Sequence, residues 1–173
     1  TRASAYFHLQ DFERAISDWS QALKLDPENV DILANRALAY QRLDEPENAL
    51  KDYEVLAKMV PDAPLIHRII GDLNFQANEF EAAIEAYSEA ILWDDQNEIA
   101  IFNRGVAQIQ IEAYHPAISD FEAVLALDQN HVEAQKRLAD AYFLIDWFQQ
   151  AINSYQAAIV LDDNDPLLFY NLG

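Results

Sequence analysis

The chain has 173 residues, 51% of them hydrophobic, with only three glycines, six prolines and no cysteine, which excludes disordered, collagen-like and disulfide-stapled proteins. Thirty acidic residues against 11 basic ones give a formal net charge of -19, so we expect neither nucleic acid nor an anionic membrane as a partner. No apolar run approaches the roughly 18 residues of a membrane-spanning helix, and we predict a soluble protein, with the cytoplasm favoured as its compartment.

The spacing of apolar residues predicts an all-helical chain. In the stretch that starts at Val30, VDILANRALAYQRL, apolar residues recur every three or four positions, as one buried face of a helix requires. Pro46 and Pro116 fall in the first turn of later helices, where a missing N–H costs least. Full helices are expected at 12–25, 30–43, 47–59, 64–77, 80–93, 98–111, 116–127, 132–144 and 148–161, with partial helices at 1–8 and 167–172.

A period of 34 residues organises these helices. An alanine recurs once per period, an aromatic residue stands four positions after it, and a small residue stands twelve positions before it. If the small residue lets two helices approach and the aromatic ring fills the gap beside the alanine, each helix pair must stack on the next to bury both its faces. The alanines are Ala15, Ala49, Ala83, Ala117 and Ala151, the aromatic residues Trp19, Tyr53, Tyr87, Phe121 and Tyr155, and the small residues Ala3, Ala37, Gly71, Gly105 and Ala139.

These residues resemble the tetratricopeptide repeat family. Three units also carry a tyrosine three positions after the small residue, at Tyr6, Tyr40 and Tyr142, whereas Asn74 and Gln108 stand there in the other two. The resemblance implies an all-α, right-handed solenoid of stacked antiparallel helix pairs. Its first helices would line a concave groove that commonly receives an extended peptide or a partner helix.

The resemblance covers nearly the whole chain, and we expect a single array over residues 1–173. Its units are a partial repeat 1–29, full repeats 30–63, 64–97, 98–131 and 132–165, and a partial repeat 166–173. The chain starts at Thr1 without an initiator methionine and stops inside an expected helix, so it reads as a fragment of a longer protein. Uncapped solenoid ends expose an apolar face, which makes self-association a further possibility.

Motifs for chemistry are not found. The four histidines are not spaced as ligands on one helix face, and the acidic run at 162–165 lacks the glycine and closing glutamate of a calcium loop. There is no glycine-rich phosphate loop, no nucleophile elbow and no cysteine nucleophile. We predict no enzyme activity, no cofactor and no metal. Core packing, rather than stacking on bases, is expected for Trp19, Trp93 and Trp147.

The groove positions implied by the family carry as many bases as acids, so the surplus acid is assigned to the outer surface. An apolar stripe distinguishes the groove, although part of it is alternatively buried between adjacent first helices. Asn35 and Asn103 are expected to hydrogen-bond to a ligand backbone through their side-chain amides. Alternatively, these amides face only water or Arg36 and Arg104. The predicted groove residues are Asn35, Arg42, Arg68, Asp72, Phe75, Phe102, Asn103, Val106, Ile109, Lys136, Arg137, Asp140 and Phe143.

We therefore predict a protein-interaction scaffold that binds a peptide or partner segment in the groove of the third to fifth units. One alternative is a non-catalytic recruitment arm of a larger enzyme or of a secretion or assembly machine. Another is a co-chaperone-like binder of a chaperone C-terminal tail. Family members with that role use lysine, asparagine or arginine at five groove positions, where this chain has Arg68, Asp72, Asn103, Glu133 and Arg137.

Overall fold

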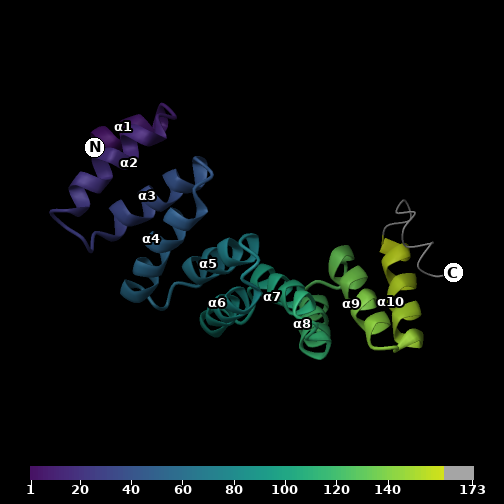
Figure 1. Cartoon of the computed structure of the whole chain (residues 1–173). Coiled ribbons are helices and arrows are strands. Elements are labelled where there is room, and N and C mark those ends of the chain that lie inside the picture. The colour runs from purple at the N-terminus through teal and green to yellow at the C-terminus, as the bar shows by residue number, and fades with distance from the viewer. Residues whose placement is uncertain (162–173) are drawn as a thin grey trace.

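The structure, a computed structural model, describes residues 1–161 of the chain. Within these residues the chain forms ten α-helices and no β-strand (Figure 1). Each of the ten was predicted from the sequence, and the partial helix predicted at 167–172 lies outside the described residues. The helices are α1 (Arg2–His8), α2 (Phe12–Leu23), α3 (Val30–Arg42), α4 (Pro46–Met59), α5 (Pro64–Gln76), α6 (Phe80–Trp93), α7 (Glu98–Gln110), α8 (Tyr114–Leu127), α9 (Val132–Leu144) and α10 (Phe148–Leu161).

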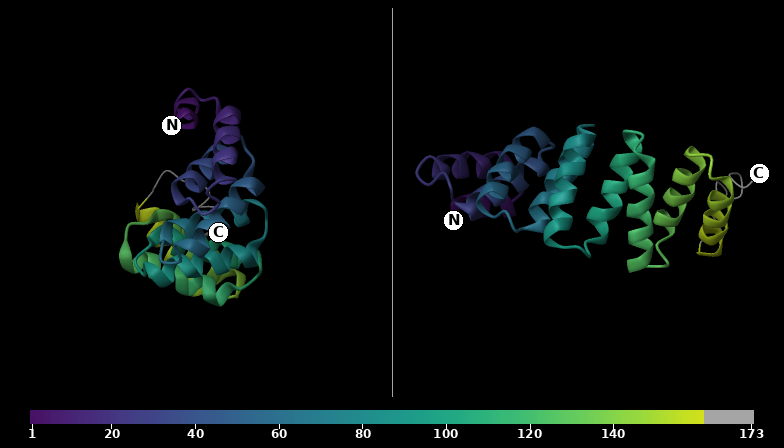
Figure 2. Two further views of the ribbon diagram at one scale, coloured as in Figure 1. Left: turned by 90° about the vertical axis from the view of Figure 1, so that its left-hand side faces the viewer. Right: turned by 90° about the horizontal axis from the view of Figure 1, so that it is seen from below.

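The helices stack side by side in an elongated row, with the N-terminus at one end and α10 at the other (Figures 1 and 2). Each helix packs mainly on the helices before and after it in the chain. The odd-numbered helices α3, α5, α7 and α9 start at residues 30, 64, 98 and 132. This arrangement is the all-helical solenoid that the 34-residue period predicts.

Several helix boundaries differ from the predicted ones by one or two residues. Helix α8 starts at Tyr114 rather than at residue 116, and α2 ends at Leu23 rather than at residue 25. The first N–H groups of a helix have no partner inside it, so Pro116 is accommodated at the third position of α8 as well as it would be at the first. As predicted, Pro27 and Pro61 lie between helices.

The turn inside each helix pair uses one residue in the left-handed conformation. In the third pair, Asn78 has φ 61°. Its N–H donates to the carbonyl of Phe75, and the next N–H, of Glu79, donates to the carbonyl of Asn74. These two bonds satisfy carbonyl groups at the end of α5 in the manner of a Schellman motif. The equivalent residues, 34 positions apart, are Gln10, Asp44, Asn78, Glu112 and Asp146, none of them a glycine.

The small and large residues of the period meet inside each helix pair, as predicted. Ala83 and Ala117 are fully buried. A Cβ atom added to Gly71 would lie 2.5 Å from the Tyr87 ring, and one added to Gly105 would lie 2.8 Å from the Phe121 ring. The two glycines are therefore required by the close approach of an aromatic ring from the second helix.

The tryptophans do not all lie in the core. Trp19 is buried, as expected from its place in the aromatic series of the period. Trp93 and Trp147 are 50% and 45% exposed, so their assignment to the core was wrong. Trp93 ends α6 and Trp147 directly precedes α10, and residues at helix ends are reached by solvent from the turns. Trp147 is partly covered by stacking on Tyr142, at 5.9 Å between ring centroids.

A second periodic feature is an arginine of the first helix that pairs with an aspartate of the second. Arg36 binds Asp52 with two hydrogen bonds of 2.8 and 2.6 Å, and its third nitrogen donates to Ser20 of the preceding unit at 3.0 Å. The hydrogen bonds that Arg36 donates to Asp52 raise the pKa of the Arg36 guanidinium, although burial opposes this shift. Arg36 thereby ties the three successive helices α2, α3 and α4 together. The same pairing occurs between Arg2 and Asp18 and between Arg104 and Asp120.

Candidate peptide-binding groove

A pocket of about 420 Å³ opens where α5, α7 and α9 come together. The floor and walls combine apolar, amide and charged side chains from four helices. Every lining residue except Gln76 and Tyr87 belongs to the predicted groove set. The lining consists of Asp72, Phe75 and Gln76 from α5, Tyr87 from α6, Phe102, Asn103 and Val106 from α7, and Arg137 from α9.

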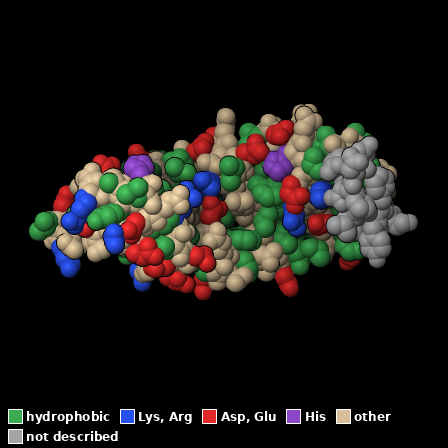
Figure 3. All heavy atoms as spheres, turned by 90° about the horizontal axis from the view of Figure 1, so that it is seen from above, with side chains coloured by type: hydrophobic (Ala, Val, Ile, Leu, Met, Phe, Trp, Pro, Cys, Tyr) green, Lys and Arg blue, Asp and Glu red, His purple; other side chains and the backbone are tan. Residues whose placement is uncertain are grey.

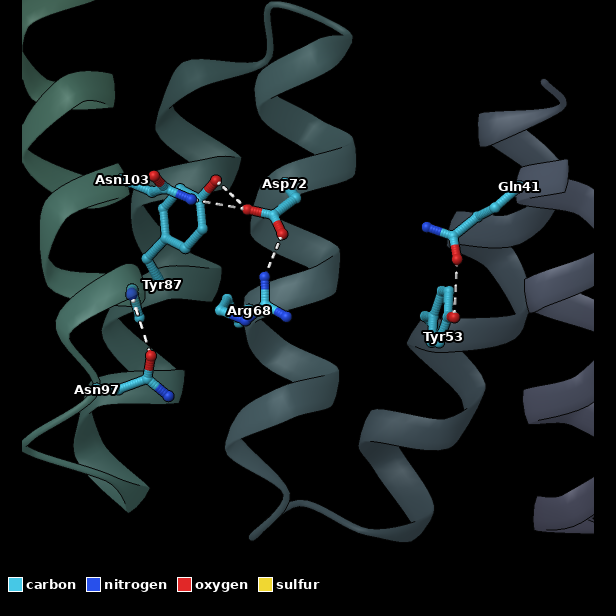
Figure 4. A network of polar contacts seen from close by, with 8 residues as sticks. Gln41, Tyr53, Arg68, Asp72, Tyr87, Asn97 and Asn103 are labelled. Carbon is cyan, nitrogen blue, oxygen red and sulfur yellow. Dashed lines mark hydrogen bonds and ion pairs between the residues drawn. The ribbon is translucent and has the colours of Figure 1, made fainter.

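The carboxylate of Asp72 forms the polar wall of this pocket. Its Oδ2 accepts a hydrogen bond from Nη1 of Arg68 at 2.7 Å. Its Oδ1 accepts from the hydroxyl of Tyr87 at 2.8 Å and from Nδ2 of Asn103 at 3.0 Å. Figure 4 shows these side chains converging from three helices. Because donors from α5, α6 and α7 hold one carboxylate, its position is fixed before any ligand arrives.

Tyr87 was not predicted as a site residue, because its place in the period assigns it to the core. It is indeed only 1% exposed, but its hydroxyl reaches the pocket. Burial raises the pKa of Tyr87, and the adjacent carboxylate of Asp72 raises it further, so at neutral pH the hydroxyl remains a hydrogen-bond donor. The sequence did contain a signal. An aspartate fifteen residues before the tyrosine occurs here and again at Asp140 and Tyr155, which are joined at 2.6 Å.

The apolar stripe is only partly exposed. Phe75, Phe102, Val106 and Ile109 are half-buried and pack against the core clusters, so the alternative of burial between helices holds for part of the stripe. Phe102 stacks on the ring of His131, at 5.1 Å between centroids. Phe143 is 55% exposed and lies outside the pocket.

The two asparagines do not face only water or arginine, whereas their expected contact with a ligand backbone stays a prediction. Asn35 donates its Nδ2 to the carbonyl of Asp31, one turn earlier in the same helix, at 2.6 Å. The side chain of Asn103 bridges α7 to Asp72 on α5. One amide hydrogen of each side chain is therefore already used within the protein.

The bases at the C-terminal side of the groove lie beside an acid. Glu133 accepts from Nε of Arg137 at 3.0 Å, and Nζ of Lys136 lies 3.5 Å from its other oxygen. Arg42 lies on α3, away from the pocket. A space-filling view shows acidic, basic and hydrophobic side chains interspersed on one face, without a large area of a single charge (Figure 3). The groove is thus close to neutral, although the chain as a whole is strongly acidic.

Within the described residues, no three histidine, aspartate or glutamate side chains are placed to hold a metal ion. The same part of the chain contains no helix that is both long and apolar enough to cross a membrane.

Models of the tetratricopeptide repeat match residues 3–44, 34–97 and 102–169. The chain belongs to the tetratricopeptide repeat family. The resemblance seen in the sequence is thereby confirmed, and so is the solenoid fold.

Curated relatives include a peptidyl-prolyl isomerase and an Hsp70-Hsp90 organizing protein. The peptidyl-prolyl cis-trans isomerase FKBP4 of Rattus norvegicus is 26% identical over 147 residues, which cover 76% of this chain and 32% of that protein. The Hsp70-Hsp90 organizing protein 3 of Arabidopsis thaliana is 28% identical over 97 residues, which cover 56% of this chain and 17% of that protein. The chain thus spans a third or less of the length of these relatives.

Solved structures with the same fold include MamA, with a TM-score of 0.85 and 21% identity over 94% of this chain and 95% of that one. YrrB, described as a protein with an unusual peptide-binding site, has a TM-score of 0.86 and 18% identity over 97% and 87%. The first repeat domain of RPAP3, bound to the HSP90 peptide SRMEEVD, has a TM-score of 0.61 and 23% identity over 63% and 86%. At these identities the likeness is one of fold.

Proposed function

We propose that this chain is a protein-interaction scaffold that binds an extended segment of a partner protein across α5, α7 and α9. The pocket between these helices carries the proposal. It is concave and pre-formed, and it places half-buried apolar side chains next to fixed polar groups. The likeness in fold between this chain and domains that bind peptides supports this interpretation.

The segment that fits such a pocket has both apolar and polar side chains. Phe75, Phe102 and Val106 offer apolar contact, while Asp72 and Arg137 offer one charge of each sign. Because the charges are balanced and Asp72 already accepts three hydrogen bonds, a strongly charged segment of either sign gains little. Apolar anchors are therefore expected to supply most of the affinity.

Selection of binders from a random peptide library displayed on phage, followed by calorimetry with the best peptide, tests this proposal. Phe102→Ala and Arg137→Ala are expected to weaken binding about tenfold or more, as for central interface residues. Phe148→Ala and Arg14→Ala remove the same side-chain types from exposed sites outside the pocket and serve as matched controls. Equal losses in both pairs of variants, all still helical by circular dichroism, would contradict the proposal.

Binding of an acidic chaperone tail is a second candidate, favoured by the relatives named as Hsp70-Hsp90 organizing proteins. Two of the five positions used by such family members are acidic here, at Asp72 and Glu133, and both lie beside the bases that would otherwise meet a terminal carboxylate. We propose that the tail is for this reason bound weakly or not at all.

The peptide SRMEEVD and its C-terminal amide distinguish the two candidates. We expect no tight binding of either peptide to the unaltered chain. The double variant Asp72→Asn with Glu133→Lys carries the residue types that the family uses and is expected to gain binding of the free acid alone. Tight binding of the free acid by the unaltered chain, lost on amidation, would favour the chaperone-tail candidate instead.

We also propose that the chain works without catalysis of its own, in the cytoplasm, as one tetratricopeptide array with the repeat boundaries predicted above. Its match to about a third of a peptidyl-prolyl isomerase supports a role as the recruitment arm of a larger protein. In that setting the groove would bind its partner in the same way, and deletion of the array would remove recruitment while leaving catalysis of small substrates intact.

A further inference from the structure

A second hollow, of about 550 Å³, lies between α4 and α6 with α5 beneath it. None of its lining residues lines the pocket of the proposed groove. The lining contains three glutamates and no lysine or arginine. It consists of Glu54 from α4, His67, Ile70 and Asn74 from α5, and Ala82, Ile84, Glu85, Ala86, Ser88 and Glu89 from α6.

The 34-residue period shows what fills the equivalent place in two other units. In the fourth unit, Arg104 donates to Asp120 on the second helix and to Ser88 on the helix before. The second unit repeats this arrangement with another arginine, aspartate and serine. In the third unit the three positions are taken by Ile70, Ala86 and Glu54, in that order. The hollow is therefore the space that an arginine occupies elsewhere in the same molecule.

In the fifth unit a tyrosine, rather than an arginine, donates a hydrogen bond at the equivalent place. It also lacks the arginine and carries a glutamate, Glu122, at the position of the serine. There the hydroxyl of Tyr142 donates to that glutamate at 2.6 Å. The residue of the third unit that corresponds to Tyr142 is Asn74. Glu54 therefore has neither the arginine of the second and fourth units nor the tyrosine of the fifth.

Asn74 is, after Glu54, a second residue of the hollow whose side chain lacks a hydrogen-bond partner within residues 1–161. Its side chain lines the hollow, it is only 9% exposed, and within the described residues its amide makes no hydrogen bond. Its amide atoms are open to the hollow, because Oε1 of Gln108 is the one fully buried side-chain polar atom without a hydrogen bond in the described part of the chain. The Asn74 amide is therefore available to a group that enters the hollow. Glu54, Glu85 and Glu89 likewise have no ion pair within the described part of the chain. The carboxylates are too dispersed for a metal ion, since no cluster of three ligands occurs there.

We propose that this hollow binds an arginine side chain of a partner protein. A guanidinium carries five N–H donors in a plane, enough to reach carboxylates on both α4 and α6 together with the amide oxygen of Asn74. Its flat faces and methylene stem pack on Ile70 and Ala86, which replace the charged pair of the other units. The net charge of -19 favours the approach of a basic partner. This site is independent of the proposed peptide groove.

Nitrogen–proton correlation NMR of the labelled chain, titrated with N-acetyl-L-arginine amide, tests the proposal. N-acetyl-citrulline amide has nearly the same shape without the charge and serves as the control ligand. We expect saturable shifts of backbone amides around Glu54 on α4 and Glu85 on α6 with the arginine derivative, and none there with the citrulline derivative. Equal shifts with both ligands, or shifts confined to the pocket between α5, α7 and α9, would overturn the proposal.

Two variants locate the binding at the hollow. Glu54→Ser places the serine of the other units here and is expected to weaken binding about tenfold, as for the loss of a charged hydrogen bond. Glu81→Ser removes an exposed glutamate of α6 that does not line the hollow and is expected to leave binding unchanged. The double variant Ile70→Arg with Ala86→Asp rebuilds the pair of the other units and is expected to abolish the shifts. Binding that persists in the Glu54→Ser chain at full strength would refute the site.

Discussion

The guanidinium of Arg104 holds the carboxylate of Asp120 with two nearly parallel hydrogen bonds, Nε to Oδ2 at 2.8 Å and Nη2 to Oδ1 at 2.7 Å. The aspartate is almost fully buried between α7 and α8. Removal of the arginine alone leaves this charge without a partner, whereas removal of both members leaves an apolar contact like that of Ile70 and Ala86 in the third unit. The two substitutions are therefore strongly non-additive.

We expect Arg104→Ile to lower the free energy of unfolding by about 3 kcal/mol. The double variant Arg104→Ile with Asp120→Ala is expected to recover most of that loss. Urea unfolding followed by circular dichroism measures both. A double variant that is less stable than either single one would contradict the argument from an unpaired buried charge.

The alanines of the period leave no room for a larger side chain. Ala117 is fully buried on α8, whereas Ala123 on the same helix is exposed. Ala117→Leu is expected to destabilise the chain by about 1 to 3 kcal/mol through overpacking, and Ala123→Leu by much less. Thermal unfolding of the two variants provides the comparison. The packing argument fails if their midpoints fall by the same amount.

The bridge from Asn103 to Asp72 joins two repeats. Asn103→Ala is expected to lower stability by about 1 kcal/mol, because a hydrogen bond between α7 and α5 is lost. Asn35→Ala is the matched control, since Asn35 is also inside a first helix but bonds only within its own helix. Chemical denaturation is expected to show a change of less than about 0.5 kcal/mol for that variant. A larger loss for Asn35→Ala than for Asn103→Ala would argue against the bridge.

Glu112 occupies the left-handed turn between α7 and α8, with φ 61°. Glycine adopts this conformation without steric cost, so Glu112→Gly is expected to raise stability by up to about 1 kcal/mol. Gln110→Gly, two residues earlier and still in α7, is expected to lower it by about 1 kcal/mol. Changes of the same sign in the two variants, by calorimetry, would rule out this account of the turn.

The raised pKa of Tyr87 predicts a loss of stability at alkaline pH. The unfolded chain ionises this tyrosine at a pKa of about 10, whereas the folded chain keeps it protonated to higher pH. Its contribution is therefore complete below pH 10 and declines as the pH rises further. We expect a shallower decline above pH 10 for Tyr87→Phe than for Tyr114→Phe, whose hydroxyl has no hydrogen bond within residues 1–161. Parallel curves of unfolding free energy against pH would disprove the assignment.

Much of the fold follows from local pattern, because every helix pair repeats the same contacts at the same spacing. That periodicity also brought Asp72, Phe102 and Arg137 together correctly, since they lie on successive first helices. The turns were not foreseen, because their left-handed residues are not glycines and hydrogen bonds to the preceding helix stabilise them instead. The role of Tyr87 and the partner of Asn103 depend on side-chain directions across helices, which spacing along the chain does not encode.

The arginine ties also divide the array mechanically. Arg36 joins α2, α3 and α4, and Arg104 joins α6, α7 and α8, but no arginine spans α4, α5 and α6. Helices α4 and α5 have the sparsest contact of any consecutive pair in the described chain. When the two ends are pulled apart, the junctions bear the load in series and the least connected one yields first. Under tension the molecule is therefore expected to behave as two stiff rods with a compliant hinge between α4 and α5.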